Sequence, residues 1–426
     1  MTIPFEYDYH SCVERHGSTR ILPRAASRAL DAALRVVPVV VLLGARQTGK
    51  TTLVRSQPVL AERPYLTLDD LTVRLQAEAD PEALVSRAPE LVLDEVQRAK
   101  DLLIAVKRAV DRDRPRRPGR FVLTGSANLL MLRRIGESLA GRASYVTLWP
   151  LTVAEIRGLG RTGRWRELLS VPPTRWKEVL EAESVARSDW HEVVRRGGFP
   201  VPAHELTTHE ERAHWFSGYL QTYLERDLPD LRAVENLGDF RRLAQAACLR
   251  IGSLLNQAEL GRDVGLSQPQ VHRFLNVLEA SFLAIRLPAY SVNRTKRLIK
   301  APKLYWGDTG FALYLSGETE PRGAHLENLI LLDLLAWRET EILRPNILYW
   351  RTADGTEVDF VIETPRRLLP IEVKAATRVG PRDAKGLEVF LDEYADKARG
   401  GLLLYAGEEV FPLTRRVLAA PWWKIL

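Results

Sequence analysis

Cysteine is nearly absent from this sequence: its 426 residues include two, Cys12 and Cys248, which match no metal-ligand spacing. Two such cysteines also provide no disulfide framework, and their scarcity favours a reducing compartment. Long apolar runs are missing as well, because the longest, VVPVVVLLGA, has the length of a strand and ends in glycine. The amino-terminal segment contains acids and no apolar core run, so no secretory signal peptide is expected. We therefore expect a cytoplasmic protein without a membrane partner.

The sequence does have the composition of a globular protein, with 46% hydrophobic and 27% charged residues. A chain of 426 residues is too long for one ordinary core, so two or three domains are expected. The formal net charge of +7 is compatible with a polyanionic partner but does not establish one.

The clearest motif is an apolar run followed by a glycine-rich loop. Residues 36–54, VVPVVVLLGARQTGKTTLV, join a pattern typical of a buried parallel strand to the pattern GxxxxGK[ST]. Glycines let successive N–H groups point at phosphate, and the next helix adds its dipole. A glycine-rich turn without a ligand is the alternative. We predict that Lys50 reaches the β- and γ-phosphates of ATP and that Thr51 holds Mg²⁺. The predicted ATP-binding residues are Gly44, Ala45, Arg46, Gln47, Thr48, Gly49, Lys50, Thr51, Thr52 and Asp94.

A second apolar strand, Leu91–Leu93, ends in two acids. We predict that Asp94 binds Mg²⁺ through water and that Glu95 orients and deprotonates the attacking water. An acidic pair at a helix N-terminus is the alternative, since the helix dipole favours it. The strand before this pair and the glycine-rich loop upstream favour the catalytic interpretation.

Polar residues follow a third strand, in RFVLTGSAN (120–128). Ser126 and Asn128 are candidates for sensing the γ-phosphate, because they come at the carboxyl edge of such a sheet. Arg142 precedes another apolar strand. It could stabilise transition-state charge, in cis or across a subunit interface, and a surface arginine is an equal alternative.

These motifs, with LVLDEVQ, LTGSAN, LAGR, LWPLTVAEI, RRGGFP and YLQTYLERDLPDL, resemble a group of prokaryotic AAA-type ATPases. In that group the ATPase precedes a C-terminal domain of unknown function. The resemblance extends from about Leu22 to the end of the chain. It implies a P-loop fold and nucleotide chemistry, and the group's C-terminal region is similar to restriction-endonuclease-like folds. Residues 158–187, rich in tryptophan and arginine, have no counterpart in these motifs, so we interpret them as an insertion.

Residues 254–290 predict a helix, a turn, a second helix and a strand, which is the order of a winged helix. Gly265 ends the first helix and Ser267 is a good N-cap for the second. The segment that follows has no acid between Glu279 and Asp308. We predict that it grips DNA or RNA phosphates while aromatic side chains stack on bases, and a solvated hairpin between two domains is the alternative. The predicted nucleic-acid-binding residues are Arg286, Arg294, Lys296, Arg297, Lys300 and Lys303.

Residues 355–376, GTEVDFVIETPRRLLPIEVKAA, predict two amphipathic strands joined by a tight turn. Strand alternation is expected to place Val358, Phe360 and Ile362 on one face and Glu357, Asp359 and Val361 on the other. On the second strand, Glu372 and Lys374 share a face, so Asp359, Glu372 and Lys374 are expected to project from one side.

An amphipathic helix upstream, residues 323–337, carries Glu327 near its start. A helix acid, a strand acid and then E-x-K is the order of the PD-(D/E)xK nucleases. We predict that Asp359 and Glu372 bind one or two Mg²⁺ ions, that Glu327 assists, and that Lys374 faces the scissile phosphate. The alternatives are a half-buried hairpin with outward charges and a nuclease-like fold that only binds.

The predicted fold class is α/β: a P-loop NTPase parallel sheet, a helical and winged-helix-like middle domain, and a C-terminal restriction-endonuclease-like α/β domain. We predict ATP-dependent binding, remodelling or cleavage of nucleic acid. The alternatives are an ATP-driven switch or scaffold with a silent nuclease fold, and a nucleotide-using modification enzyme or toxin component. Association into a homo-oligomer is left open. The predicted parts are an extension (1–21), the ATPase domain (22–189), the middle domain (190–320) and the nuclease-like domain (321–426).

Overall fold

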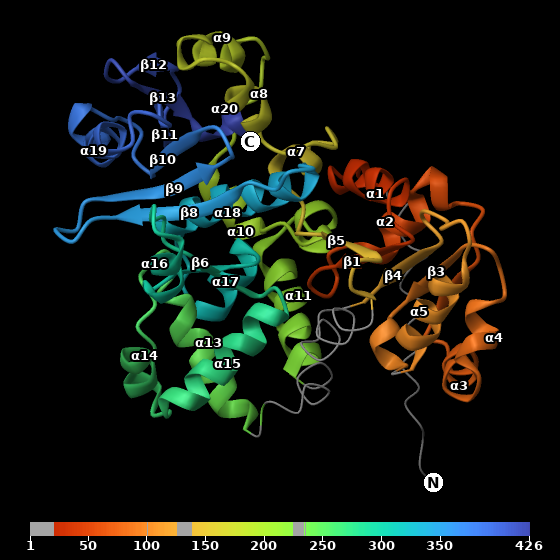
Figure 1. The fold of residues 1–426 in the computed structure, drawn as a ribbon. Coiled ribbons are helices and arrows are strands. Elements are labelled where there is room, and N and C mark those ends of the chain that lie inside the picture. Colours follow the sequence, from red (N-terminus) through yellow and green to blue (C-terminus); the bar gives the residue numbers. More distant parts are fainter. Residues whose placement is uncertain (1–20, 100, 126–138, 225–233, 235) are drawn as a thin grey trace.

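The computed structural model describes residues 21–99, 101–125, 139–224, 234 and 236–426. It contains a five-stranded sheet early in the chain and a six-stranded sheet late in the chain, with a group of helices and a two-stranded sheet between them (Figure 1). Within these residues no helix is long and apolar enough to cross a bilayer.

The first sheet has five parallel strands in the order β2-β3-β4-β1-β5. Every residue of β1 is buried, as its continuous apolar run predicts. In a parallel sheet all carboxyl ends meet at one edge, so the loops after β1, β3 and β4 are neighbours. The strands are β1 (Val39–Leu43), β2 (Tyr65–Thr67), β3 (Leu91–Asp94), β4 (Phe121–Thr124) and β5 (Ala143–Thr147).

Alternate residues of β1 contribute to two cores, one on each face of this sheet. Val40 and Leu42 pack with Leu30 of the first helix, whereas Val39 and Val41 pack with residues of the fifth. A parallel sheet covered on both faces is the predicted P-loop NTPase arrangement, so this part of the fold prediction is confirmed. The helices are α1 (Ala26–Leu34), α2 (Lys50–Ser56), α3 (Leu71–Ala79), α4 (Pro81–Val85) and α5 (Leu102–Arg112), with short turns η1 (Pro58–Leu60) and η2 (Val96–Arg98).

The segment interpreted as an insertion forms two short helices that pack against the C-terminal part of the chain. The indole Nε1 of Trp165 and the backbone N–H of Gly163 both donate to Asp333 Oδ1, at 2.6 Å and 2.8 Å. Trp165 and Trp176 share one core with Trp422. The segment therefore packs against residues of the C-terminal part that are more than 150 positions away in the chain. The elements here are α7 (Val153–Ile156), α8 (Trp165–Ser170), η3 (Pro173–Arg175) and α9 (Trp176–Glu181).

The middle helices contain the predicted helix, turn, helix and strand. Gly265 takes a left-handed conformation at the end of the first helix, with φ 69°, and Ser267 forms a capping box with Gln270. The basic segment that follows is not a plain hairpin, because part of it forms a helix, α16. The elements are α10 (Trp190–Arg196), η4 (Val201–Glu205), α11 (His209–Thr222), α13 (Leu237–Cys248), α14 (Gln257–Val264), α15 (Gln268–Ala280), β6 (Ala284–Leu287), α16 (Arg294–Ile299), β7 (Lys303–Trp306) and α17 (Thr309–Ser316).

The second sheet is mixed, with the order β12-β13-β11-β10-β9-β8. β9 pairs antiparallel with β8 and β10, and β10 pairs parallel with β11. Helix α18 covers one face of this sheet and α19 covers the other. The elements are α18 (Gly323–Thr340), β8 (Asn346–Arg351), β9 (Glu357–Glu363), β10 (Leu368–Lys374), η6 (Pro381–Ala384), α19 (Lys385–Glu393), β11 (Gly401–Tyr405), β12 (Phe411–Pro412), β13 (Val417–Pro421) and α20 (Trp422–Ile425).

The alternation predicted for β9 is wrong at one point. Val358 pairs with Trp350 and Val361 with Leu348, so two residues of β9 lie opposite one residue of β8. Such a bulge shifts the alternation by one position. Val358 and Val361 consequently pack in the core under α19, whereas Phe360 packs in the core under α18. Asp359 is one of the two residues inside the bulge.

Candidate nucleotide site and carboxylate cluster

The loop after β1 has the backbone that the glycine-rich pattern predicts. Gly44 adopts φ 150°, and a Cβ there would lie 2.3 Å from the carbonyl oxygen of Leu148. Gly49, at the start of α2, adopts φ 89°. Both positions require glycine, because a side chain would clash at the first and strain the backbone at the second. The predicted residues from Gly44 to Thr52 thus form this loop and the first turn of α2.

Lys50 folds back onto its own loop. Its Nζ donates to the carbonyl oxygens of Gly44 and Ala45, at 3.1 Å and 2.8 Å, and the side chain is buried. A phosphate group in the loop would offer this ammonium charged oxygen partners, which form stronger hydrogen bonds than neutral carbonyls.

Asp94 lies where three strands end and accepts hydrogen bonds from three hydroxyl groups. Thr51 Oγ1 donates to Asp94 Oδ2 at 3.1 Å, as expected of two residues that hold one Mg²⁺ ion. Tyr65 also donates to Oδ2, and Thr124 donates to Oδ1. Neither hydroxyl was predicted from the sequence. Thr124 could have been found from the sequence, because it stands at the end of an apolar strand. Tyr65 could not, because it begins a three-residue strand that has no clear sequence pattern.

Glu95 follows Asp94 in a left-handed backbone conformation, with φ 55°. For a residue with a side chain this conformation costs about 1 kcal/mol or more. Gln97 Nε2 donates to Glu95 Oε2 and so holds the carboxylate at the phosphate edge of the sheet. Retained strain at a carboxyl end supports a catalytic role for Glu95 over a simple helix-capping acid.

One other residue predicted around the phosphates is not part of this constellation. Arg142 forms a double ion pair with Asp111, with Nε–Oδ1 2.6 Å and Nη2–Oδ2 3.1 Å. It precedes β5 and accepts from Val39 N, so it lies at the amino ends of the strands, opposite the phosphate edge. The predicted role of Arg142 in cis is therefore wrong. Asn128, like Ser126, lies outside the described residues.

A cavity of about 250 Å³ adjoins the loop and was not foreseen. It lies between the start of α2 and the middle helices, and both apolar and polar side chains line it. Arg24 closes the loop side, because its Nη1 donates to the Thr48 carbonyl oxygen at 2.9 Å. This combination suits a planar base. Its lining includes Ile21, Leu22, Thr52, Leu53, Pro200, His204 and Glu205.

The second constellation lies at the C-terminal sheet, where the structure brings together the residues predicted from helix and hairpin. Lys374 Nζ lies 2.6 Å from Glu372 Oε1. Asp359 Oδ2 accepts from the backbone N–H of Val373 at 2.9 Å, which ties the bulge of β9 to β10. Glu327 of α18 accepts from Tyr305 at 3.0 Å.

Lys303 is the unexpected member of this carboxylate cluster. It is 2% exposed, and its Nζ lies 3.2 Å from Asp359 Oδ1 and 4.0 Å from Glu327 Oε2. It also pairs with Glu357. Although burial acts to lower it, the surrounding carboxylates raise the pKa of Lys303 above its usual value. The predicted contact between Lys303 and nucleic-acid phosphate is therefore wrong, because the ammonium is buried and already neutralised.

The other two carboxyl groups of the cluster, those of Glu327 and Glu372, have raised pKa values and are hard to ionise. Burial, and next the charge of Asp359, raise the pKa of Glu327 to about 8. The same two causes raise the pKa of Glu372 to about 8. The Oε2 atom of Glu372 is buried and accepts no hydrogen bond.

As arranged, however, the cluster does not fit a divalent metal ion. In the described part of the chain no three histidine, cysteine or acidic side chains converge closely enough to hold one. Mg²⁺ requires near-octahedral oxygen ligands at about 2.1 Å. Asp359 instead directs one oxygen to Lys303 and the other to the Val373 amide.

The basic segment divides into paired and exposed cations. Arg297 forms a double ion pair with Glu363, at 2.6 Å and 2.8 Å, and Arg286 pairs with Glu279. Both guanidinium groups therefore already have carboxylate partners within the chain. Three predicted nucleic-acid-binding residues are exposed on or beside α16: Arg294, Lys296 and Lys300.

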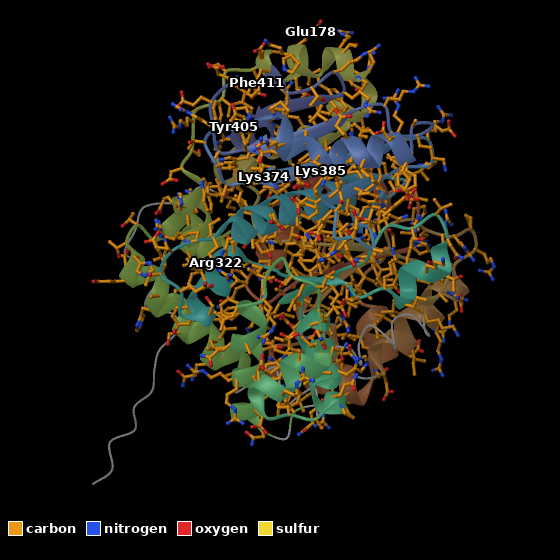
Figure 2. All side chains as sticks on the ribbon, turned by 90° about the vertical axis from the view of Figure 1, so that its left-hand side faces the viewer. Glu178, Arg322, Lys374, Lys385, Tyr405 and Phe411 are labelled. Atoms are coloured by element: carbon orange, nitrogen blue, oxygen red, sulfur yellow. The ribbon has the colours of Figure 1, made fainter. Side chains whose placement is uncertain are left out.

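An open groove of about 370 Å³ lies beside the carboxylate cluster, on the α19 side of the sheet. Glu372 and Lys374 line it together with Arg382 and Lys385. Figure 2 shows Lys374 and Lys385 near each other on one face of the molecule. The lining of the groove thus combines three cations with four acids, Asp354, Glu357, Glu372 and Asp383.

Three family models match successive parts of the chain. Residues 37–157 match the family model described as an AAA domain. Residues 187–322 and 322–425 match two domains of unknown function, DUF8612 and DUF4143. Among solved structures, the Walker-type ATPase of Pyrococcus abyssi is 19% identical and covers 70% of this chain and 99% of its own, with a TM-score of 0.42.

Two mycobacterial proteins are similar over nearly the whole chain. The uncharacterized proteins Rv2008c of Mycobacterium tuberculosis and Mb2031c of Mycobacterium bovis are each 32% identical over 414 residues, which is 95% of this chain and 84% of theirs. The chain therefore belongs to the same family as these two proteins, and its first module is an AAA-type P-loop ATPase domain.

Proposed function

We propose that this protein hydrolyses ATP with Mg²⁺ and uses the cycle to change how its middle and C-terminal parts hold nucleic acid. The observation that carries the ATPase part is the meeting of Lys50, Thr51, Asp94 and Glu95 at one edge of the parallel sheet. The observation that favours nucleic acid is the row of exposed cations on and beside α16.

The chain's own groups account for the hydrolytic step. Backbone N–H groups of the glycine-rich loop and the Lys50 ammonium would bind the phosphate oxygens. Thr51 and Asp94 present adjacent oxygens that fit Mg²⁺, which when bound neutralises phosphate charge. Glu95 would accept a proton from the attacking water, since Gln97 holds its carboxylate at the same edge.

A second candidate function is strand cleavage at the C-terminal sheet. The observation that favours it is the open groove in which Lys374 and Glu372 lie beside Arg382 and Lys385. A phosphodiester backbone in this groove would have Lys374, Arg382 and Lys385 as cationic partners, beside the acids of the same lining. A binding site without cleavage, and a switch without nucleic acid, are the competing functions.

One experiment separates these functions. Wild-type protein is titrated with labelled single- and double-stranded DNA and RNA, with and without ATP and Mg²⁺, while phosphate release and strand length are measured. We expect at least one polymer to bind and to change the ATPase rate. Binding without any change in ATPase rate would contradict coupling, and intact strands throughout would leave the C-terminal site as a binding site. Absence of binding to all four polymers would contradict the nucleic-acid proposal.

A further inference from the structure

Four arginines form a row where the insertion (158–187) meets helices α7, α10 and α11. In the order of the row, Arg161 belongs to the insertion, Arg157 directly follows α7, Arg196 ends α10 and Arg212 lies in α11. Burial, and next the charge of Arg161, lower the pKa of Arg157. Burial, and next the charge of Arg212, lower the pKa of Arg196, and Arg157 acts on it in the same direction. Each guanidinium group therefore feels the positive charge of its neighbour in the row.

Carboxylates compensate only the two ends of this arginine row. Arg161 Nη2 donates to both carboxylate oxygens of Glu183, at 2.9 Å and 2.7 Å. At the other end, Arg212 Nη1 donates to Glu192 Oε1 at 2.7 Å. Arg212 is 7% exposed, so this ion pair is held within the packed helices.

The two arginines in the middle of the row have no carboxylate partner. Arg157 Nη2 donates to neutral oxygens, the Ala186 carbonyl at 3.3 Å and Ser188 Oγ at 2.8 Å. Among the residues that the structure describes, Arg196 donates to no acceptor, and its Nε is buried. Glu192 lies one turn before Arg196 on α10 but already accepts from α11. Two half-buried guanidinium groups thus act on each other without an anion hydrogen-bonded to either.

We propose that Arg157 and Arg196 bind an oxyanion of the phosphate type. Partly buried like charges are costly unless a counter-charge accompanies them. The four guanidinium groups and the two carboxylates of the row leave an excess of two positive charges. A phosphate group carries close to two negative charges at neutral pH, whereas a carboxylate carries one. Guanidinium groups also present planar N–H pairs that match phosphate oxygens.

This oxyanion site is separate from the nucleotide site. Neither Arg157 nor Arg196 lines the cavity beside the glycine-rich loop. The proposal therefore goes beyond ATP hydrolysis and beyond the cations of α16. It also gives the insertion a part in binding, because the Ala186 carbonyl holds Arg157 and the insertion contributes Arg161.

The test measures thermal unfolding of the full chain in sodium phosphate and in sodium chloride of equal ionic strength. Because the glycine-rich loop would also bind phosphate, every protein in the test carries Lys50→Ala. We expect about 10 mM phosphate to raise the melting temperature by about 2 °C or more over chloride. Adding Arg196→Met keeps an apolar stem and removes the charge, so this shift should be lost. The matched control is Arg195→Met, whose guanidinium pairs with exposed Glu320 at 2.6 Å, and it should keep the shift.

A second variant keeps the test decisive. If Arg196→Met does not fold, Arg157→Met removes the other half of the pair and should lose the phosphate shift in the same way. A phosphate shift that persists in Arg196→Met or Arg157→Met would overturn the proposal. Equal melting temperatures of the Lys50→Ala protein in phosphate and chloride would overturn it as well.

One further comparison separates two sources of the phosphate group. A dinucleotide with a 5′-phosphate and the same dinucleotide without it are added at the concentration used for free phosphate. If the 5′-phosphorylated form raises the melting temperature more than free phosphate does, and only while Arg196 is present, the ligand is the end of a nucleic-acid strand. If free phosphate alone gives the Arg196-dependent shift, the ligand is the free ion.

Discussion

At the residue scale, the nucleotide site depends on a few side chains that adopt unusual conformations or are buried. Glu95 keeps a left-handed backbone conformation, and Lys50 is buried against its own loop. Neither feature stabilises an isolated sheet. Both become useful when a phosphate group brings charged oxygens to the lysine and water to the glutamate.

The first prediction separates binding from turnover. Lys50→Ala should weaken nucleotide binding strongly and abolish hydrolysis, because the phosphate loses the Lys50 ammonium. Glu95→Gln should bind ATP nearly as wild type does and lower the turnover rate by about 10²-fold or more, because an amide cannot accept the proton of water. Fluorescent-nucleotide titration and phosphate release measure the two effects. Wild-type turnover in either variant would contradict the assignment.

The second prediction concerns Tyr65, which shares Asp94 Oδ2 with Thr51. Tyr65→Phe removes one hydrogen bond that fixes the carboxylate, so a higher Mg²⁺ concentration should be needed for half-maximal ATPase activity. Nucleotide affinity measured without Mg²⁺ should not change. The control is Tyr145→Phe, which removes a hydroxyl from another strand of the same sheet. An unchanged Mg²⁺ requirement in Tyr65→Phe would leave its hydroxyl without a part in metal binding.

At the element scale, part of the basic segment forms helix α16, which carries both paired and exposed cations. Its paired arginine, Arg297, anchors the helix to β9 through Glu363, while its other cations remain in solvent. Reversing the charges of Arg294, Lys296 and Lys300 should weaken nucleic-acid binding and reduce its salt slope by about 2 to 3, because about three fewer counterions are released. ATP binding without nucleic acid should be unchanged.

The control for this variant is a second triple reversal far from α16. Arg114, Arg116 and Arg117 are exposed in the loop before β4 and carry the same total charge. If both variants weaken binding equally, net charge alone is responsible and α16 is not a specific site. Affinity is measured at several salt concentrations so that the slopes can be compared.

Another element-scale prediction concerns the insertion. Burial raises the pKa of Asp333 to about 7, although Trp165 and Gly163 donate to it. A folded-state pKa above the ordinary 3.8 means that the folded state holds a proton that the unfolded chain loses. Stability should therefore fall as pH rises from about 4 to 7, by up to about 4 kcal/mol from this group. Asp333→Asn keeps the acceptor oxygen and should flatten this pH dependence in denaturant unfolding. The same slope in both proteins would contradict the assignment.

Sequence patterns predicted the parallel sheet and the glycine-rich loop because these depend on local runs and on glycine positions. They failed where the partner of a residue is distant in the chain. Arg142 meets Asp111, and Lys303 meets Asp359, across separations that no local pattern encodes. The bulge of β9 was equally hidden, since EVDFVIE alternates acceptably in either register until its pairing with β8 is known. The family resemblance predicted the order of the modules, but it did not predict that Lys303 is the counter-ion of Asp359.

At the scale of the whole molecule, the base-sized cavity and the carboxylate cluster are joined by a short run of contacts. Pro200 lines the cavity, and the preceding backbone N–H groups of Gly198 and Phe199 donate to Asp308 Oδ2, at 2.6 Å and 3.1 Å. Asp308 follows β7, the strand that begins with Lys303. A nucleotide that shifts the turn at Pro200 would therefore act on β7 through a buried carboxylate.

The last prediction tests this connection as a coupling free energy. In wild type, a non-hydrolysable ATP analogue should change nucleic-acid affinity by about 5-fold or more, and nucleic acid should change analogue affinity by the same factor. Asp308→Asn weakens the link to Gly198 and Phe199, so both factors should fall towards one, while each ligand alone still binds. The control is Asp333→Asn, which alters another buried acid between modules and should keep the coupling. Linkage depends only on how each ligand distinguishes the two states of the shared element, here β7 with Asp308. Equal coupling in wild type and Asp308→Asn would therefore show that the two sites communicate by another route.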